Sequence, residues 1–281
     1  MKKILVPTDF SSFADNALKV ALGFARRTQA EIVLLNVILA PSHVTIECSE
    51  EGTHLGTTSD QGYFEQVIGH LQDTLRDIIQ GLDYEKVSYQ IRSGNITQAI
   101  MAYVENNQID MIVMGTQGDS NYDALFVGSN AEKVVQLADC PVITIRNVEG
   151  EVRFDDIVFA TDLMVSKHQP IDSIKQIQAL YDAKLHLVYV NTPGNFQPTF
   201  DLNQKAESFV DAYSIDNYNF YIYCDFVEDD GINHFAEEIQ ADLILVVSHK
   251  RRGFARLLAG SIAAGVVTTS NIPVLTFSLK S

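Results

Sequence analysis

Three glycines along residues 115–130, in the segment GTQGDSNYDALFVGSN, have a spacing suited to binding a phosphate. Gly115 and Gly118 follow an apolar run, and Gly128, Ser129 and Asn130 open a segment with helical spacing. Glycine lets a backbone approach a bulky anion closely, and the N–H groups at a helix start attract negative charge. No Lys stands where a P-loop requires one. The spacing therefore leaves two interpretations open, a phosphate cradle without a cation or loop glycines with turn roles only.

The chain repeats itself, and the repeat shows which elements surround this loop. ILVPTDFS at 4–11 returns as IVFATDLM at 157–164, and QIDMIVMGTQG at 108–118 returns as QADLILVVSHK at 240–250. VGSNAEKVVQLADCPVITI at 127–145 returns as AGSIAAGVVTTSNIPVLTF at 259–277. Ordered matches of this kind indicate a duplicated unit. We predict two domains, residues 1–147 with the glycine loop intact and residues 154–281 with a degenerate version.

Within each copy, apolar runs alternate with segments of helical spacing. The runs ILVP, EIVLLNVI, DMIVMG and PVITI lack polar alternation, as is typical of strands buried on both faces. In the first helical segment, apolar residues from Phe13 to Phe24 recur on one stripe, and Ser11 or Ser12 is placed to cap its start. This order predicts an α/β fold, with a five-stranded parallel sheet per copy and helices on both faces. Ligands of such sheets bind beyond the carboxyl ends of the strands.

Composition restricts the partners of this chain. Its 281 residues are 46% hydrophobic, which is ample for two packed cores, and its net charge is −16. An acidic chain is unsuited to coating nucleic acid or anionic membranes, which require clustered Lys and Arg. Cys48, Cys140 and Cys224 form no CxxC pair, and we see no signal peptide and no apolar run long enough to span a membrane. We expect a cytoplasmic protein with neither nucleic acid nor membrane as a partner.

Together, PTDFS, NVI, MGTQG-x9-GSNAEKVV and CPVITIR resemble the universal stress protein family in its tandem two-domain form, over nearly the whole chain. The resemblance implies two flavodoxin-like, Rossmann-like sandwiches with strand order 3-2-1-4-5. It also implies that the first domain binds ATP, or ADP or AMP, with Mg²⁺ bound through the phosphates. By position, Pro7, Thr8 and Asp9 would border the adenosine, Val37 and Met114 would flank the adenine, and Gly115 would lie at the ribose. The phosphates would meet Gly118, Gly128, Ser129 and Asn130.

The second copy departs from this pattern. Val247 replaces Gly115, Lys250 replaces Gly118 and Ala160 replaces Pro7, although Asp162 is retained. A Cβ at Val247 would crowd the place where the backbone approaches a ligand. The basic segment HKRRGFARLLAGS could hold an anion through side chains, but we interpret it as a solvated, degenerate loop.

A polar stretch from Pro41 to Gly62 follows the second strand. It contains His43, Glu47, Cys48 and His54, whose spacing fits no standard zinc pattern. We predict a mobile surface loop there and no metal site. Without a GxSxG elbow or a paired histidine, no catalytic residue is predicted either.

Three functions stay open at this point. The first is a stress-response protein in which an adenine nucleotide controls conformation or the choice of a protein partner. The second is a slow, metal-dependent ATP hydrolase, and the third is a nucleotide-free interaction scaffold. In each case we expect the two copies to meet through their last strands as an intramolecular pseudo-dimer.

Overall fold

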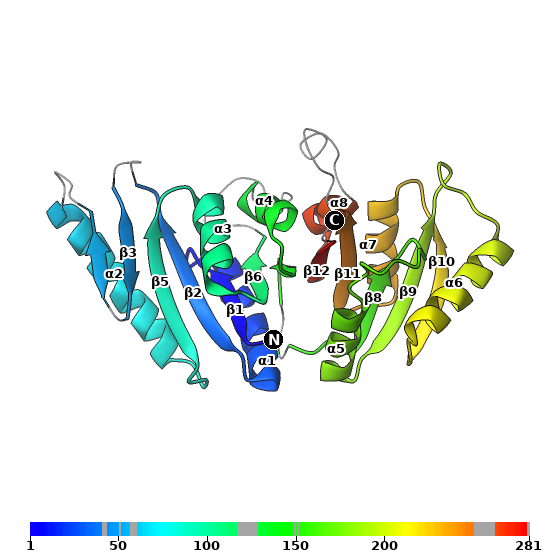
Figure 1. Ribbon diagram of the computed structural model, residues 1–281, viewed down its shortest axis with the longest axis horizontal. Helices are drawn as coiled ribbons and strands as arrows, with labels where there is room; N and C mark the ends of the chain where they lie inside the picture. The colour runs from blue at the N-terminus through cyan, green and yellow to red at the C-terminus, as the bar shows by residue number, and fades with distance from the viewer. Residues whose placement is uncertain are drawn as a thin grey trace. The chain divides into compact units, whose positions relative to one another are not determined.

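A computed structural model of the protein describes residues 1–40, 44–50, 52–56, 61–116, 129–148, 150, 152–249 and 262–279 (Figure 1). It contains two compact units. The first holds the described residues up to Thr116 together with 129–140, and the second holds those from Pro141 onward. Gly118 and Gly128 lie outside the described residues, as do His43, Lys250 and the rest of the basic segment after it.

The first unit is a sheet with helices between its strands. Its order is β6-β1-β2-β5-β3-β4, and β6, β1, β2 and β5 are parallel to their neighbours. In the numbering of the predicted five strands, this is the order 3-2-1-4, with the fifth strand in the other unit. The elements are β1 (Lys3–Pro7), α1 (Ser12–Thr28), β2 (Glu31–Ile38), β3 (Ile46–Ser49), β4 (Thr53–Leu55), α2 (Gln61–Gln80), β5 (Val87–Ser93), α3 (Ile96–Asn107), β6 (Met111–Gly115) and α4 (Ser129–Leu137).

The stretch after β2 contains a hairpin that the sequence prediction took for a mobile loop. Strands β3 and β4 pair antiparallel, and β3 pairs antiparallel with β5 at the edge of the sheet. Buried Cys48 holds the hairpin, because its thiol accepts the Gln72 amide N–H at 2.9 Å and lies 3.2 Å from the Thr53 hydroxyl. The Glu47 carboxylate forms an ion pair with Arg92 at 3.1 Å. Two of the four side chains considered for zinc therefore have structural partners, and no group of three metal-ligating side chains occurs among the described residues.

Helix α1 forms as its apolar stripe predicts. Ser11 is the N-cap, and its hydroxyl accepts the Ala14 backbone N–H at 3.3 Å. Asp15 lies in the first turn, where it complements the helix dipole. Val20 and Phe24 are fully buried. The stripe fixes the orientation of α1 on the sheet, and the Ser11 cap fixes where the helix starts relative to the end of β1.

The second unit has the predicted strand order in full. Its sheet is β10-β9-β8-β11-β12, all parallel, which is 3-2-1-4-5 for the second copy. Strand β7 then pairs antiparallel with β12. The elements are β7 (Val142–Ile145), β8 (Asp156–Ala160), α5 (Ile171–Tyr181), β9 (Lys184–Asn191), α6 (Thr199–Tyr213), β10 (Tyr218–Cys224), α7 (Glu228–Glu238), β11 (Leu243–His249), α8 (Ile262–Thr269) and β12 (Val274–Leu279).

Strand β7 is the fifth strand of the first copy by sequence, yet it completes the sheet of the second unit. Thr144 is opposite Val274 in the antiparallel register, and its hydroxyl donates to the Val274 carbonyl at 3.3 Å. Just beyond β7, Arg146 donates to the Asn271 side chain at 3.2 Å and to the Thr268 carbonyl at 3.0 Å. The last strands of the two copies therefore pair with each other, and side chains reinforce the pair.

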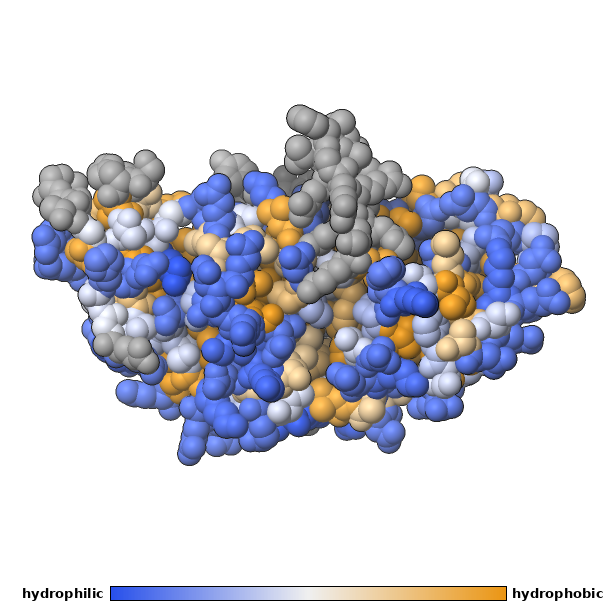
Figure 2. Space-filling view, viewed as in Figure 1, coloured by the Kyte–Doolittle hydropathy of each residue, from blue (hydrophilic) through white to orange (hydrophobic). Residues whose placement is uncertain are grey.

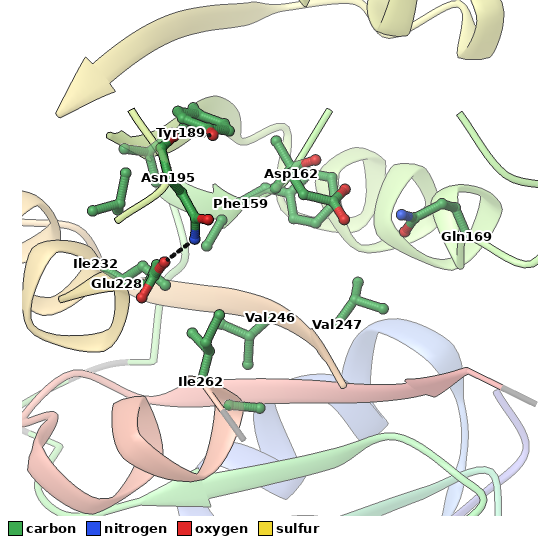
Figure 3. Close-up of a pocket in the computed structure, with 15 residues that line it drawn as sticks. Phe159, Asp162, Gln169, Tyr189, Asn195, Glu228, Ile232, Val246, Val247 and Ile262 are labelled. Atoms are coloured by element: carbon green, nitrogen blue, oxygen red, sulfur yellow. Dashed lines mark hydrogen bonds between the residues drawn. The ribbon is translucent and has the colours of Figure 1, made fainter. Parts of the chain in front are cut away.

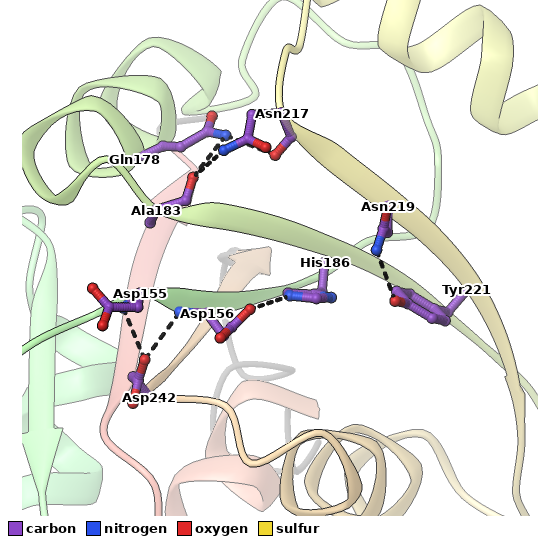
Figure 4. Close-up of polar contacts among 9 residues, drawn as sticks. All are labelled: Asp155, Asp156, Gln178, Ala183, His186, Asn217, Asn219, Tyr221 and Asp242. Atoms are coloured by element: carbon purple, nitrogen blue, oxygen red, sulfur yellow. Dashed lines mark hydrogen bonds and ion pairs between the residues drawn. The ribbon is translucent and has the colours of Figure 1, made fainter.

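At the opposite, amino-terminal edge of each sheet, one aspartate carboxylate accepts two backbone N–H groups. In the second unit, one Asp242 oxygen accepts the backbone N–H groups of Asp155 at 2.8 Å and Asp156 at 2.9 Å (Figure 4). In the first unit, one Asp110 oxygen accepts the N–H groups of Lys2, just before β1, and Lys3, its first residue. Figure 4 also shows His186 bonded to Asp156 at 2.8 Å. These contacts fix the first and fourth strands of each copy at one end and leave the carboxyl ends for other roles.

The surface seen in Figure 2 is mostly hydrophilic, with hydrophobic residues visible between the polar ones. None of the helices in the described ranges combines the length and the apolar character needed to cross a bilayer.

Candidate functional site

The turn after β1 holds Thr8 and Asp9 at the carboxyl edge of the first sheet. The Thr8 N–H donates to the Leu35 carbonyl at 2.9 Å, and the Thr8 carbonyl accepts the Asn36 side-chain amide at 2.9 Å. Asp9 is exposed, and its carboxylate accepts the Ser11 backbone N–H at 3.1 Å. The turn is thus fixed against β2, with a carboxylate at the edge of the sheet.

The second unit repeats this turn. The Thr161 N–H donates to the Val188 carbonyl at 3.1 Å, and the Asp162 carboxylate accepts the Met164 N–H at 3.0 Å. The residue after each Thr–Asp pair has a positive φ, 65° at Phe10 and 61° at Leu163. The Thr–Asp pair therefore shapes the turn in both units, and its repetition by itself does not indicate a ligand.

Pro7, Val37 and Met114 lie on three neighbouring strands at the same edge. Pro7 pairs with Leu35, so half-buried Val37 lies one pleat further along β2. Met114, at the end of β6, is only 6% exposed. The structure brings these predicted residues to one edge, with Val37 the more accessible and Met114 part of the floor.

Gly115 has a packing role that the sequence analysis did not consider. A Cβ added there would lie 2.8 Å from both the carbonyl carbon and the Cβ of Phe13 in α1, closer than real Cβ contacts come. Glycine is therefore required for the start of α1 to approach β6. This requirement holds whether or not a ribose lies beside Gly115.

Thr116 is a residue that the sequence analysis missed. It directly follows Gly115, is 3% exposed, and its hydroxyl has no hydrogen-bond partner. A buried hydroxyl without a partner costs about 1–3 kcal/mol, so such groups commonly mark a place where a water or a ligand supplies the missing bond. In the sequence, Thr116 could have been recognised as a polar residue at the end of an apolar run, between Gly115 and Gly118.

Helix α4 begins at Ser129, as the motif predicts. Asn130 is half-buried, and its side-chain carbonyl accepts the Thr97 hydroxyl at 3.2 Å. This bond ties α4 to α3, so Asn130 orients the helix start. Gly118 and Gly128, the other predicted phosphate residues, are in the part of the chain that the structure does not describe.

The second unit contains a cavity of about 210 Å³ at its carboxyl edge (Figure 3). It lies at the ends of β8, β9 and β11, where the turn, α7 and α8 meet. Gly231 lets α7 come this close, because a Cβ there would lie 2.5 Å from a Val190 methyl group. The lining residues are Phe159, Ala160, Thr161, Asp162, Gln169, Val188, Tyr189, Val190, Asn195, Glu228, Ile232, Val246, Val247, Ile262 and Ala263.

The polar groups of this cavity lie at its two ends. Figure 3 shows Glu228 and Asn195 together at one end, joined by a 2.8 Å hydrogen bond, and Gln169 at the other. The Gln169 side-chain oxygen is buried and has no hydrogen-bond partner. Tyr189 is 7% exposed, and burial raises the pKa of its phenol, with nearby Glu228 and Asp162 adding to the rise. Tyr189 is therefore neutral at physiological pH and adds no charge.

The sequence analysis treated the second copy as degenerate and did not foresee this cavity. The main argument for degeneracy was the replacement of Gly115 by Val247. In the first unit, the start of α1 requires glycine at this position, but in the second unit the corresponding helix, α5, starts later. Helix α5 begins only at Ile171, after Pro170, so residues 163–170 form no helix and Gln169 reaches the cavity from them. Val247 lines the cavity instead of clashing. Pro170 was the available signal that the helix starts late.

The chain belongs to the universal stress protein family. The sequence profile of the Universal stress protein family matches residues 1–146 and 227–278, more than half of the chain. A universal stress protein of Methanothermobacter thermautotrophicus is 30% identical over 158 residues, 52% of this chain and 97% of its own. Universal stress protein Slr1230 of Synechocystis is 22% identical over 300 residues, which covers 99% of this chain and 100% of that protein.

A solved structure extends the likeness to the whole fold. The crystal structure of a universal stress protein from Archaeoglobus fulgidus matches with a TM-score of 0.74 and 23% identity, covering 99% of this chain and 97% of that one. At that identity the match concerns the fold alone. It agrees with the α/β fold predicted for both copies.

Proposed function

We propose that the protein is a cytoplasmic stress-response regulator whose first unit binds ATP or a related adenine nucleotide. The observation that carries the proposal is the convergence of the Thr8–Asp9 turn, half-buried Val37 and unpartnered Thr116 at the carboxyl edge of one parallel sheet, the usual ligand edge of such folds. Helix α4 starts at Ser129 in the same unit, and the N-terminus of a helix favours phosphate.

In this proposal Val37 and Met114 flank the adenine, the Asp9 carboxylate accepts a hydrogen bond from the adenosine, and the segment from Gly118 to Asn130 receives the phosphates. Mg²⁺ would be bound through the phosphate oxygens, which are its usual ligands at nucleotide sites. Binding would stabilise one conformation by the difference in affinity between the two states.

A titration of the full-length protein with ATP and Mg²⁺ in a calorimeter tests the proposal. We expect one equivalent of nucleotide to bind. Asp9→Asn should weaken binding several-fold, because the amide loses the negative charge while its oxygen still accepts the Ser11 N–H. Asp162→Asn is the matched control, since Asp162 makes the same turn in the second unit, and it should leave the affinity unchanged.

The two alternative functions predict different results. Release of inorganic phosphate that depends on Mg²⁺ and is lost in Asp9→Asn would favour a slow hydrolase. Absence of ATP, ADP and AMP binding, both in the titration and among molecules released by denaturing the purified protein, would overturn the proposal and leave the scaffold function.

A further inference from the structure

We propose that the cavity of the second unit binds a compact apolar amine, in contrast to the nucleotide proposed for the first unit. Three features of the described residues support this: an apolar middle, hydrogen-bond acceptors at both ends, and the loss of the polar groups found at the same positions of the first unit.

The middle of the cavity is apolar. Phe159 and Val246 are almost fully buried and form part of its wall, and Val247 and Ile262 lie nearby in Figure 3. Ile262 is 49% exposed, so part of its apolar surface is open to a ligand. An apolar ligand that covers this wall gains roughly 25 cal/mol for each Å² of apolar surface removed from water.

Each end of the cavity carries at least one hydrogen-bond acceptor. Glu228 offers a carboxylate, of which one oxygen accepts the Asn195 amide, and Asp162 offers a second carboxylate. The buried oxygen of Gln169 is an acceptor with no donor. Among the described residues that line the cavity there is no Lys or Arg. Two negative charges and an unsatisfied acceptor call for a ligand that donates hydrogen bonds and carries positive charge.

A comparison of the two copies shows which residues make the cavity of the second unit apolar in its middle and acidic at its end. Aligning AEIVLLNVI at 30–38 with AKLHLVYVN at 183–191 puts Tyr189 in place of Asn36, and the alignment of 127–145 with 259–277 puts Ile262 in place of Asn130. Glu228 is the first residue of α7, as Ile96 is the first residue of α3. Two amide side chains of the first copy are thus replaced by a tyrosine and an isoleucine, and one isoleucine is replaced by a glutamate. A carboxylate disfavours a phosphate at short range, so these changes disfavour a nucleotide and favour an amine.

The size of the cavity limits the ligand. At about 210 Å³ it is smaller than the roughly 300–1,000 Å³ of sites for drug-sized ligands. A single aromatic ring with a short aminoalkyl chain is of suitable size. Phenethylamine is therefore a suitable probe, and phenylacetate is a probe of similar size with the opposite charge.

The test is a titration of the full-length protein with phenethylamine, in which binding is monitored by ligand-observed NMR. We expect phenethylamine to bind and phenylacetate to bind at least tenfold more weakly. Glu228→Gln should weaken phenethylamine binding about tenfold, as expected for loss of a charge-assisted hydrogen bond. Glu207→Gln, at an exposed position of α6, is the matched control and should have no effect.

Further variants and competitors keep the test decisive. Val247→Phe should abolish binding by filling the cavity, and circular dichroism shows whether that variant folds. Equal binding of phenylacetate, an unchanged affinity in Glu228→Gln, or no binding of phenethylamine would each overturn the proposal. Displacement of phenethylamine by ATP with Mg²⁺ would also overturn it, because it would assign a nucleotide to this cavity.

Discussion

Replacing Thr116 with valine should stabilise the protein and weaken nucleotide binding at the same time. Valine has nearly the shape of threonine but lacks the hydroxyl, which here is buried and has no partner. An unpartnered buried hydroxyl costs about 1–3 kcal/mol. Its removal should therefore raise the free energy of unfolding by at least about 1 kcal/mol, provided that no ligand is bound.

The magnitude can be checked against two other threonines of the same chain. Thr276 is 1% exposed and also has an unpartnered hydroxyl, so Thr276→Val should stabilise by a similar amount. The Thr144 hydroxyl donates to the Val274 carbonyl at 3.3 Å, so Thr144→Val should instead lose about 0.5–1.5 kcal/mol. The three variants thus predict two increases and one decrease from the same chemical change.

Thermal unfolding monitored by circular dichroism, without and with ATP, measures both effects. One kcal/mol corresponds to a shift in Tm of about 2–4 °C for a domain of 150–250 residues. ATP should raise the Tm of wild type and Thr276→Val more than that of Thr116→Val, because only Thr116 lies at the proposed nucleotide edge. A lower Tm of Thr116→Val without nucleotide would refute the reasoning, since it would mean that the hydroxyl has a partner in the ligand-free protein.

Three other predictions concern packing and charge. Gly115→Ala should destabilise by about 1–3 kcal/mol in urea unfolding, because the new methyl group would overlap the Phe13 backbone; a neutral effect would contradict the packing role. The hydrogen bond to Asp225 raises the pKa of His234 above its ordinary 6.5. The stabilisation by this pair should therefore be complete below pH 6.5 and should decline as the pH rises through the raised pKa. An NMR titration that gives the His234 imidazole a pKa at or below 6.5 would disprove this. Asp242→Ala should cost about 1–2 kcal/mol, because two backbone N–H groups at the start of β8 lose their acceptor, and hydrogen exchange should accelerate there but not in the first unit.

Most of the fold could be predicted from the sequence, because buried parallel strands leave continuous apolar runs and a duplicated chain shows each run twice. The apolar stripe of α1 was confirmed, and of the two serines predicted as its cap, Ser11 and Ser12, the structure has Ser11. The β3–β4 hairpin could not be predicted, because its strands are only four and three residues long. What stabilises it, Gln72 on the Cys48 thiol and Arg92 on Glu47, comes from distant segments.

The candidate site was predictable in position but not in detail. The rule that ligands bind at carboxyl strand ends led to Thr8, Asp9 and Gly115, yet spacing alone cannot distinguish a glycine that admits a ligand from one that admits Phe13. The cavity of the second unit was not predicted because its lining depends on where α5 starts. Only Pro170 in the sequence indicates that this helix starts late.

Strand β7 has a consequence for how such a chain can be engineered. The first repeat of the sequence ends after β7, yet β7 pairs with β12, the last strand of the second repeat. A second copy produced alone from the repeat boundary would therefore lack the strand that pairs with β12. Its β12 edge would be unpaired and prone to aggregation.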